Sequence, residues 1–217
     1  SAGENPFFTQ WDTPFGVPPF DKIRAEHFMP AFERGMSLHD AEIDAITSNN
    51  DEPTFENTIL AYDNAGQMLA QTELIFGMLC AAETNERMQA LQEQVMPLLS
   101  AHRDKIRLDE KLFARVKDVY DRRASLGLDA EQSRLLRKTY DAFVRSGALL
   151  DAGQKARLKE INGELSLTAV KFGNNILAEN NNFALELTAD DLEGLPSGVR
   201  DAAREKAQAM GKGDKWV

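Results

Sequence analysis

Apolar side chains recur at steps of three and four residues along most of this chain, and this period constrains its fold more than any other feature. One series is Phe55, Ile59, Tyr62, Gly66, Leu69, Phe76 and Cys80, and another is Met88, Leu91, Val95, Leu98, His102 and Ile106. Both match the repeat of an amphipathic helix. We therefore expect two long helices, with Thr54 as the N-cap of the first and a kink at Pro97 in the second.

Three more helices are predicted over residues 109–126, 129–146 and 151–179. Gly127 and Gly147 stand where a left-handed residue ends a helix, and Asp129 with Gln132 and Asp151 with Gln154 resemble capping boxes. After the polar run at 180–182, the alternating segment FALELT predicts a half-buried strand. A short helix from Asp190 and a helix over 197–210 complete a mainly α fold with a short β segment near the C-terminus.

The start of the chain cannot follow this helical pattern. Its first 32 residues hold five of the eight prolines and six of the twelve phenylalanines. Proline removes a backbone donor and favours extended geometry in the preceding residue. We expect an extended Pro/aromatic arm at 1–23 whose Trp11, Phe15 and Phe20 pack on the helices, a helical lobe at 24–180, and a strand–helix segment at 181–217.

The charge balance argues against two classes of partner. The chain has 25 Lys and Arg against 35 Asp and Glu, a formal net charge of −10. Such a charge repels both a nucleic-acid backbone and an anionic membrane surface, so we expect neither as a partner. The single Cys80 cannot form an internal disulfide, which leaves a reducing compartment and a bacterial periplasm equally open.

The sequence contains no recognisable catalytic or metal-binding motif. An H-E-x-x-H helix would hold zinc, but the three histidines, His27, His39 and His102, are not spaced to pair. His102 lies on an apolar helix face and is predicted to be a packing residue, while His27, at a helix start, is predicted to cap or pack. His39 stands among polar residues and is expected to be solvated.

Three other groups of residues suggest a site, and each also fits a simpler structural role. Glu160 and Glu164 share a helix face, but nearby Arg157 and Lys159 favour a solvated charged face over an acid–base pair. Cys80 has no neighbouring base, which favours burial over nucleophilic chemistry. The amides in KFGNNILAENNN, namely Asn174, Asn175 and 180–182, are suited either to binding a peptide backbone or to ending a helix.

Several segments, in order, resemble one enzyme family. They are NPFF, TPFGVPPFDKI, EHFMPAFERGM, PTFENTI, LDEKLFARV, FVRSGALLDAGQKARLKEINGELSLTAVKFGNNILAE, LEGLP and GDKWV. Together they are similar to the N-terminal part of bacterial peptidyl-dipeptidases, within the thimet oligopeptidase and oligopeptidase A family of zinc metallopeptidases. The resemblance covers essentially the whole chain and is most specific over residues 139–179.

The resemblance implies a large helical enzyme in which two lobes flank a channel that admits short peptides. It implies that zinc, its ligands and the glutamate base lie in a later, catalytic lobe, which would be the partner of this chain. No catalytic or metal residue is therefore assigned here, zinc belongs to the parent alone, and the substrate-binding residues are unknown. The ending GDKWV favours an N-terminal fragment that is inactive by itself, in a bacterial cytoplasm or periplasm. The alternative is a stand-alone helical module that binds peptides or proteins.

Overall fold

A computed structural model describes residues 4–217 and confirms that the chain is mainly helical. The chain divides into two compact units, residues 1–171 and 172–217, and the division falls within helix α7, Ala152–Asn182. The expected three-part division at 1–23, 24–180 and 181–217 stays a prediction.

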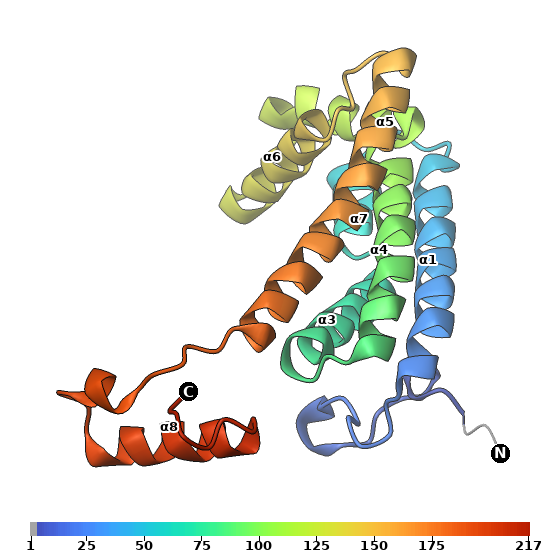
Figure 1. The fold of residues 1–217 in the computed structure, drawn as a ribbon. Helices are drawn as coiled ribbons and strands as arrows, with labels where there is room; N and C mark the ends of the chain where they lie inside the picture. The colour runs from blue at the N-terminus through green and yellow to red at the C-terminus, as the bar shows by residue number, and fades with distance from the viewer. Residues whose placement is uncertain (1–3) are drawn as a thin grey trace. The chain divides into compact units, whose positions relative to one another are not determined.

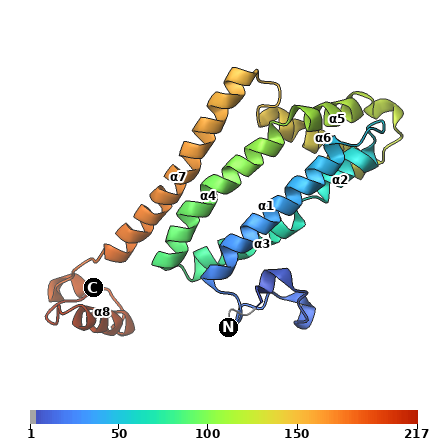
Figure 2. The ribbon, with the colours of Figure 1, turned by 90° about the vertical axis from the view of Figure 1, so that its right-hand side faces the viewer.

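Helix α1, Ala25–Thr47, is the centre of the larger unit and packs against α3, Gln67–Ala82, and α4, Glu86–Arg107 (Figures 1 and 2). Its other end contacts α5, Glu110–Asp121, and α5 packs against α6, Ala130–Arg145. Short turns of 3₁₀ helix lie at η1, Pro6–Phe8, η2, Pro14–Gly16, and η4, Arg123–Ser125.

Two apolar clusters form the core of this unit. The Phe32 cluster joins η1, α1, α3 and α4, and its buried members are Phe7, Ile23, Phe28, Ala31, Phe32, Leu69, Ile75, Phe76, Met88, Val95 and Leu99. The Phe143 cluster lies at the other end of α1, and its buried members are Ile43, Ile46, Phe55, Ile59, Ile106, Leu112, Phe113, Val116, Val119, Leu136, Phe143 and Ala148. The two clusters hold α4 along α1, and α4 carries part of the site described below.

The predicted helix boundaries that rest on local signals are confirmed. Asp129 accepts a hydrogen bond from the backbone N–H of Gln132, and the Gln132 side chain accepts one from the backbone N–H of Asp129. Asp151 and Gln154 form the same pair of bonds at the start of α7. Gly147 has φ +96°, and a Cβ there would meet Leu158 Cδ2 at 2.7 Å, so glycine is required where α7 packs back on the preceding turn.

The single long helix predicted from Phe55 to Cys80 is wrong, because the chain breaks before α3. Thr54 does cap its start, but residues Phe55–Leu60 (η3) form a π-helix that continues into the short α2, Ala61–Asp63. A turn follows, in which Gly66 adopts φ +76°. A glycine within an apolar helical repeat fits either a helix interior or a left-handed turn, and the packing of this turn on α1 selects the second.

The N-terminal arm is anchored by Phe7 and by Trp11, and the predicted packing of Trp11 against the helices is confirmed. Phe7 is buried against Phe28, and the indole N–H of Trp11 donates to the carbonyl of Pro6. The predicted packing of Phe15 and Phe20 is wrong, since Phe15 is fully exposed and Phe20 is 37% exposed. Phe15 also adopts φ +59°, and this left-handed backbone points its ring away from the protein.

The smaller unit contains the end of α7, the 3₁₀ turn η5, Ala189–Leu192, and helix α8, Ser197–Ala209. The strand predicted in FALELT is wrong for this unit. Leu187 forms a single antiparallel bridge with Trp216, with N–H to carbonyl distances of 2.8 and 3.1 Å. The alternating side chains are not half-buried as a strand face requires, because Phe183 and Leu185 are 73% and 60% exposed.

Among the described residues, the helices are too short or too polar to cross a membrane.

Candidate functional site

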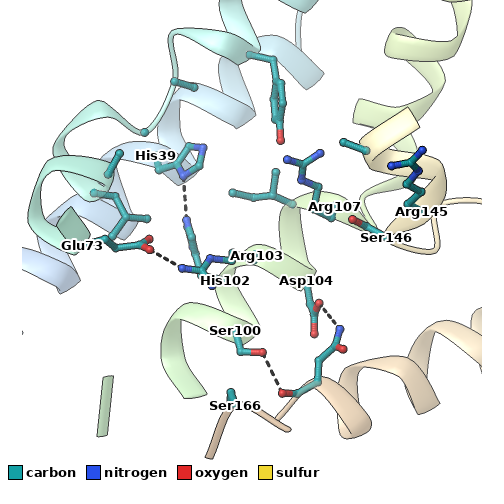
Figure 3. A pocket seen from close by; sticks show the side chains of 18 of the residues that line it. His39, Glu73, Ser100, His102, Arg103, Asp104, Arg107, Arg145, Ser146 and Ser166 are labelled. Atoms are coloured by element: carbon teal, nitrogen blue, oxygen red, sulfur yellow. Dashed lines mark hydrogen bonds and ion pairs between the residues drawn. The ribbon is translucent and has the colours of Figure 1, made fainter. Parts of the chain in front are cut away.

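A cavity of about 1670 Å³ lies in the larger unit, between α3, α4, α6 and the first half of α7 (Figure 3). Its wall includes residues from the Gly66 turn, and every lining residue lies between His39 and Ala169. The site therefore lies within one compact unit. Three parts of its wall carry polar chemistry: a histidine pair, an arginine stacked on aromatic rings, and a basic face of α6.

The histidine pair joins two helices. His39 of α1 and His102 of α4 are hydrogen-bonded, with 3.1 Å between His39 Nδ1 and His102 Nε2 (Figure 3). The Gly66 turn lies directly against the His39 ring, because a Cβ on Gly66 would be 2.8 Å from His39 Nδ1. The backbone N–H of Gly66 donates to Glu42 of α1 at 2.7 Å, which holds the turn in place.

Both histidines are biased toward the neutral form. Burial lowers the pKa of His39, against the opposing effect of Glu42 and Asp40. Burial also lowers the pKa of His102, although the Asp40 carboxylate is 3.7 Å from its Nδ1. Asp40 is itself paired with Lys105 at 2.8 Å. A neutral pair that shares one proton as a hydrogen bond is suited to holding α1 on α4.

The expectation for His39 is thus wrong, and those for His102 and His27 are confirmed. His39 is half-buried in contact with the Gly66 turn instead of solvated, because its partner comes from a helix 63 residues away. His102 is 7% exposed within the helical core. The ring of His27 accepts a hydrogen bond from the backbone N–H of Arg24 at 3.0 Å and so caps the start of α1.

Arg107 stands at the C-terminal end of α4, where a cation is favourable near the helix carbonyls. Its guanidinium lies over the Tyr62 and Phe143 rings, with its carbon 5.6 and 5.2 Å from the ring centroids. Nη1 of Arg107 is buried and has no hydrogen-bond partner within the described part of the protein. A buried donor left in this state costs about 1–3 kcal/mol.

A basic face of α6 forms a further part of the wall. Arg134, Arg137, Lys138 and Arg145 line the cavity and follow one another at helical spacing, with the single carboxylate of Asp141 among them. None of these four cations is in an ion pair among residues 4–217. The opposite face of α6 is buried through Leu136, Thr139 and Phe143, so the basic face is held toward the cavity.

Two of the three acidic groups of the cavity, Glu73 and Asp104, are already engaged. Glu73 pairs with Arg103 (Figure 3), and the side-chain amide of Asn162 donates to Asp104 at 2.8 Å. Overall, six of the lining residues are Arg or Lys and three are Asp or Glu. The cavity therefore concentrates positive charge in a chain whose net charge is −10.

The hydroxyl groups of two serines in the cavity are bonded to the main chain. Ser100 donates to the carbonyl of Asn162 and Ser166 to that of Gly163, so these hydroxyls are directed at the main chain. The hydrogen bonds described for residues 4–217 do not join a serine to His39 or His102. Within the same residues, groups of three or more His, Cys, Asp and Glu suited to a metal ion were not found, so the described side chains do not fit a zinc site.

The other candidates from the sequence are not among the residues that line this cavity. Glu160 is exposed and pairs with Arg157 at 2.8 Å, as expected for a charged helix face. Cys80 is partly buried beside the Phe32 cluster, and burial raises the pKa of its thiol. The asparagines at 174, 175 and 180–182 lie on α7, which runs to Asn182 instead of ending near Glu179.

Sequence reasoning missed Arg107 and the basic face of α6. The stacking partners of Arg107 come from α2 and α6, so no local pattern marks it. The basic face carries a signal that was available: cations at positions 134, 137, 138 and 145 share one side of a predicted helix in an acidic protein.

The chain is similar in sequence to known peptidases. Dipeptidyl carboxypeptidase from Escherichia coli (strain K12) is 38% identical over 98% of this chain, and the alignment spans 31% of that enzyme. The chain is homologous to part of the dipeptidyl carboxypeptidases. The Salmonella typhimurium dipeptidyl carboxypeptidase is 37% identical over 98% of the chain, also spanning 31% of the enzyme. Oligopeptidase A from E. coli is 25% identical over 91% of the chain, spanning 29% of that protein.

The resemblance to peptidyl-dipeptidases and oligopeptidase A seen in the sequence is confirmed by these relatives. No protein-family model matches the chain. The chain spans about a third of the length of the dipeptidyl carboxypeptidases that it matches, at 31%.

Proposed function

We propose that this chain forms the N-terminal, non-catalytic lobe of a zinc metallopeptidase that releases dipeptides from the C-termini of short peptides. The observation that carries the proposal is the 38% identity with E. coli dipeptidyl carboxypeptidase over 98% of the chain and 31% of the enzyme. In this proposal the chain supplies one wall of the space that receives the peptide. The zinc and its ligands belong to the remainder of the enzyme.

The cavity supports a wall that receives a peptide. Its size and mixed lining suit a peptide, with apolar side chains from α3, α4 and α7 beside the basic groups. His39 and His102 are hydrogen-bonded to each other, and Ser100 and Ser166 donate to main-chain carbonyls.

A replacement experiment tests this proposal. The matched third of E. coli dipeptidyl carboxypeptidase is replaced by this chain, and release of Ala-Ala from tetra-alanine is followed by chromatography. We expect dipeptide release by the chimera, loss of that activity with a chelator and recovery with Zn²⁺. The controls are the same enzyme with the matched third deleted and this chain alone, both of which should be inactive. Chelator-sensitive hydrolysis by the chain alone, or a folded but inactive chimera, would contradict the proposal.

A further inference from the structure

Positively charged side chains gather along the cavity of the larger unit. In a chain of net charge −10, the basic face of α6 presents Arg134, Arg137, Lys138 and Arg145 without ion-pair partners among the described residues. Cations scattered on a surface need no partner, because water solvates them. Four on one helix face, lining the same cavity as Arg107 and with only the Asp141 carboxylate among them, repel one another, and a further anion would relieve that repulsion.

Arg107 gives the more specific signal, because its guanidinium is fixed. The rings of Tyr62 and Phe143 hold its plane, and its Nη1 is buried with no hydrogen-bond acceptor. Of the wall carboxylates, Glu73 is bonded to Arg103 and Asp104 to Asn162, and Asp141 does not hydrogen-bond this nitrogen. Arg107 also lines the cavity, and a planar guanidinium that turns such a donor toward a carboxylate can form two parallel hydrogen bonds with it.

We propose that this cavity binds a short peptide through a carboxylate held by Arg107, with the α6 basic face drawing the carboxylate in. The identification of the ligand as a peptide rests on the proposed function. The size of the cavity, about 1670 Å³, is far greater than a small inorganic anion needs. Leu74, Leu158 and Leu165 add apolar wall, which suits side chains beside a carboxylate.

Calorimetric titration of the isolated chain tests the inference. The probe is the pentapeptide Leu-Leu-Ala-Leu-Asp, and its partner is Leu-Leu-Ala-Leu-Asn with an amidated C-terminus, which lacks both carboxylates. We expect saturable binding of the acidic peptide that weakens as NaCl is raised, and affinity lower by about tenfold or more for the amidated peptide. Equal affinity for the two peptides, or no binding of either, would overturn the proposal.

Two variants distinguish a specific effect of Arg107 on binding from the effect of losing one positive charge. Arg107→Gln should weaken binding of the acidic peptide about tenfold and leave the amidated peptide unaffected. The matched control is Arg123→Gln, because Arg123 also stacks on a tyrosine, 4.2 Å from the Tyr120 centroid, but is not among the cavity-lining residues. That variant should bind as the unaltered chain does. Equal losses in both variants would remove Arg107 from the site.

A second variant keeps the test valid if Arg107→Gln fails to fold. Arg134→Gln, Arg137→Gln and Lys138→Gln together change exposed side chains only, so folding should persist while binding and its salt dependence decrease. Unchanged binding in this triple variant would contradict a role for the α6 basic face.

Sodium phosphate is the third probe, and it separates a peptide site from a general anion site. We expect phosphate to compete only weakly. Phosphate that binds as tightly as the acidic peptide would overturn the assignment to peptide. This outcome is distinct from failure of the proposed function: an active chimera whose isolated lobe binds no peptide refutes this inference alone. An inactive chimera whose isolated lobe binds the acidic peptide refutes the proposed function alone.

Discussion

The two compact units of this chain are stabilised in different ways. The larger unit has two apolar clusters in which Phe28, Phe32 and Phe143 are completely buried. In residues 172–217 the buried apolar side chains are Leu192 and Ala207, while six large ones are more than 40% exposed: Phe172, Ile176, Phe183, Leu185, Val199 and Met210. Apolar composition alone therefore does not tell which segments form a core.

Polar contacts take a larger share in the smaller unit. Glu186 pairs with both Lys212 and Lys215, and the Arg204 guanidinium lies 5.0 Å from the centroid of the Trp216 ring. Exposed ion pairs contribute about 0–1 kcal/mol each, against roughly 1.5–3 kcal/mol for a buried large apolar side chain. The smaller unit should therefore be the less stable of the two.

The largest expected effect comes from truncating one phenylalanine in each unit. Phe32→Ala removes a completely buried ring that packs on Phe28 and Phe76, and should destabilise the larger unit by about 3–5 kcal/mol. Phe183→Ala removes a ring that is 73% exposed and should change stability by less than about 0.5 kcal/mol. Urea unfolding measures both changes.

The two tryptophans allow each unit to be followed separately. Trp11 lies in the larger unit and Trp216 in the smaller, so Trp216→Phe and Trp11→Phe backgrounds leave one fluorescent reporter for each. The Phe32→Ala loss should be seen by Trp11. A loss of several kcal/mol from Phe183→Ala seen by Trp216 would show that the smaller unit has a core around Phe183, contrary to the comparison.

The sequence predicted the parts of this fold that depend on neighbouring residues. Asp129 with Gln132 and Asp151 with Gln154 satisfy backbone groups within one turn, so their helix starts were found. Burial depends on distant partners and was predicted less well. Phe7 and Phe15 belong to the same Pro/aromatic arm, yet the first meets Phe28 on α1 and the second meets solvent.

The candidate site shows the same limit. His39 was expected in solvent because its own neighbours are polar, but His102 and the Gly66 turn cover it in the fold. Arg107 acquires its role from rings on two other segments, so only a three-dimensional structure identifies it. The basic face of α6 is different, since its spacing is local and a search for charged faces would find it.

A smaller effect on stability is expected in the larger unit, where the N-terminal arm carries the exposed ring of Phe15. Phe15 has φ +59° and no packing partner to offset that conformation. Asparagine tolerates left-handed backbone better than phenylalanine does. Phe15→Asn should therefore stabilise the larger unit by roughly 1 kcal/mol, measured by urea unfolding with the Trp11 reporter.

Phe7→Ala, in the same arm, should change the stability of the larger unit in the opposite direction. Phe7 is 8% exposed and contacts Phe28, so its truncation should destabilise the unit by about 3 kcal/mol. Loss of stability in Phe15→Asn comparable to that in Phe7→Ala would mean that the Phe15 ring is buried in solution, and the assignment of the arm anchors would be wrong.

The smallest effect is a difference in pH dependence. The folded-state pKa values of His39 and His102 are lowered by burial from 6.5, so between those values and 6.5 the unfolded chain binds more protons. The stability of the larger unit should therefore be complete above pH 6.5 and decrease as pH falls below it. Hydrogen bonds from Lys212 and Lys215 lower the pKa of Glu186 from 4.5 to about 2, so its contribution to the smaller unit is present above pH 4.5 and lost as pH falls toward 2.

Urea unfolding at a series of pH values, read through Trp11 and Trp216 separately, measures the two windows. His39→Gln with His102→Gln should flatten the Trp11 profile below pH 6.5, and Glu186→Gln should flatten only the Trp216 profile below pH 4.5. The Glu186 effect should be the weaker, because its ion pairs are exposed to solvent and screened by salt. If both reporters lost stability together near pH 6, the units would unfold as one, and the separate stabilisation of the two regions would be refuted.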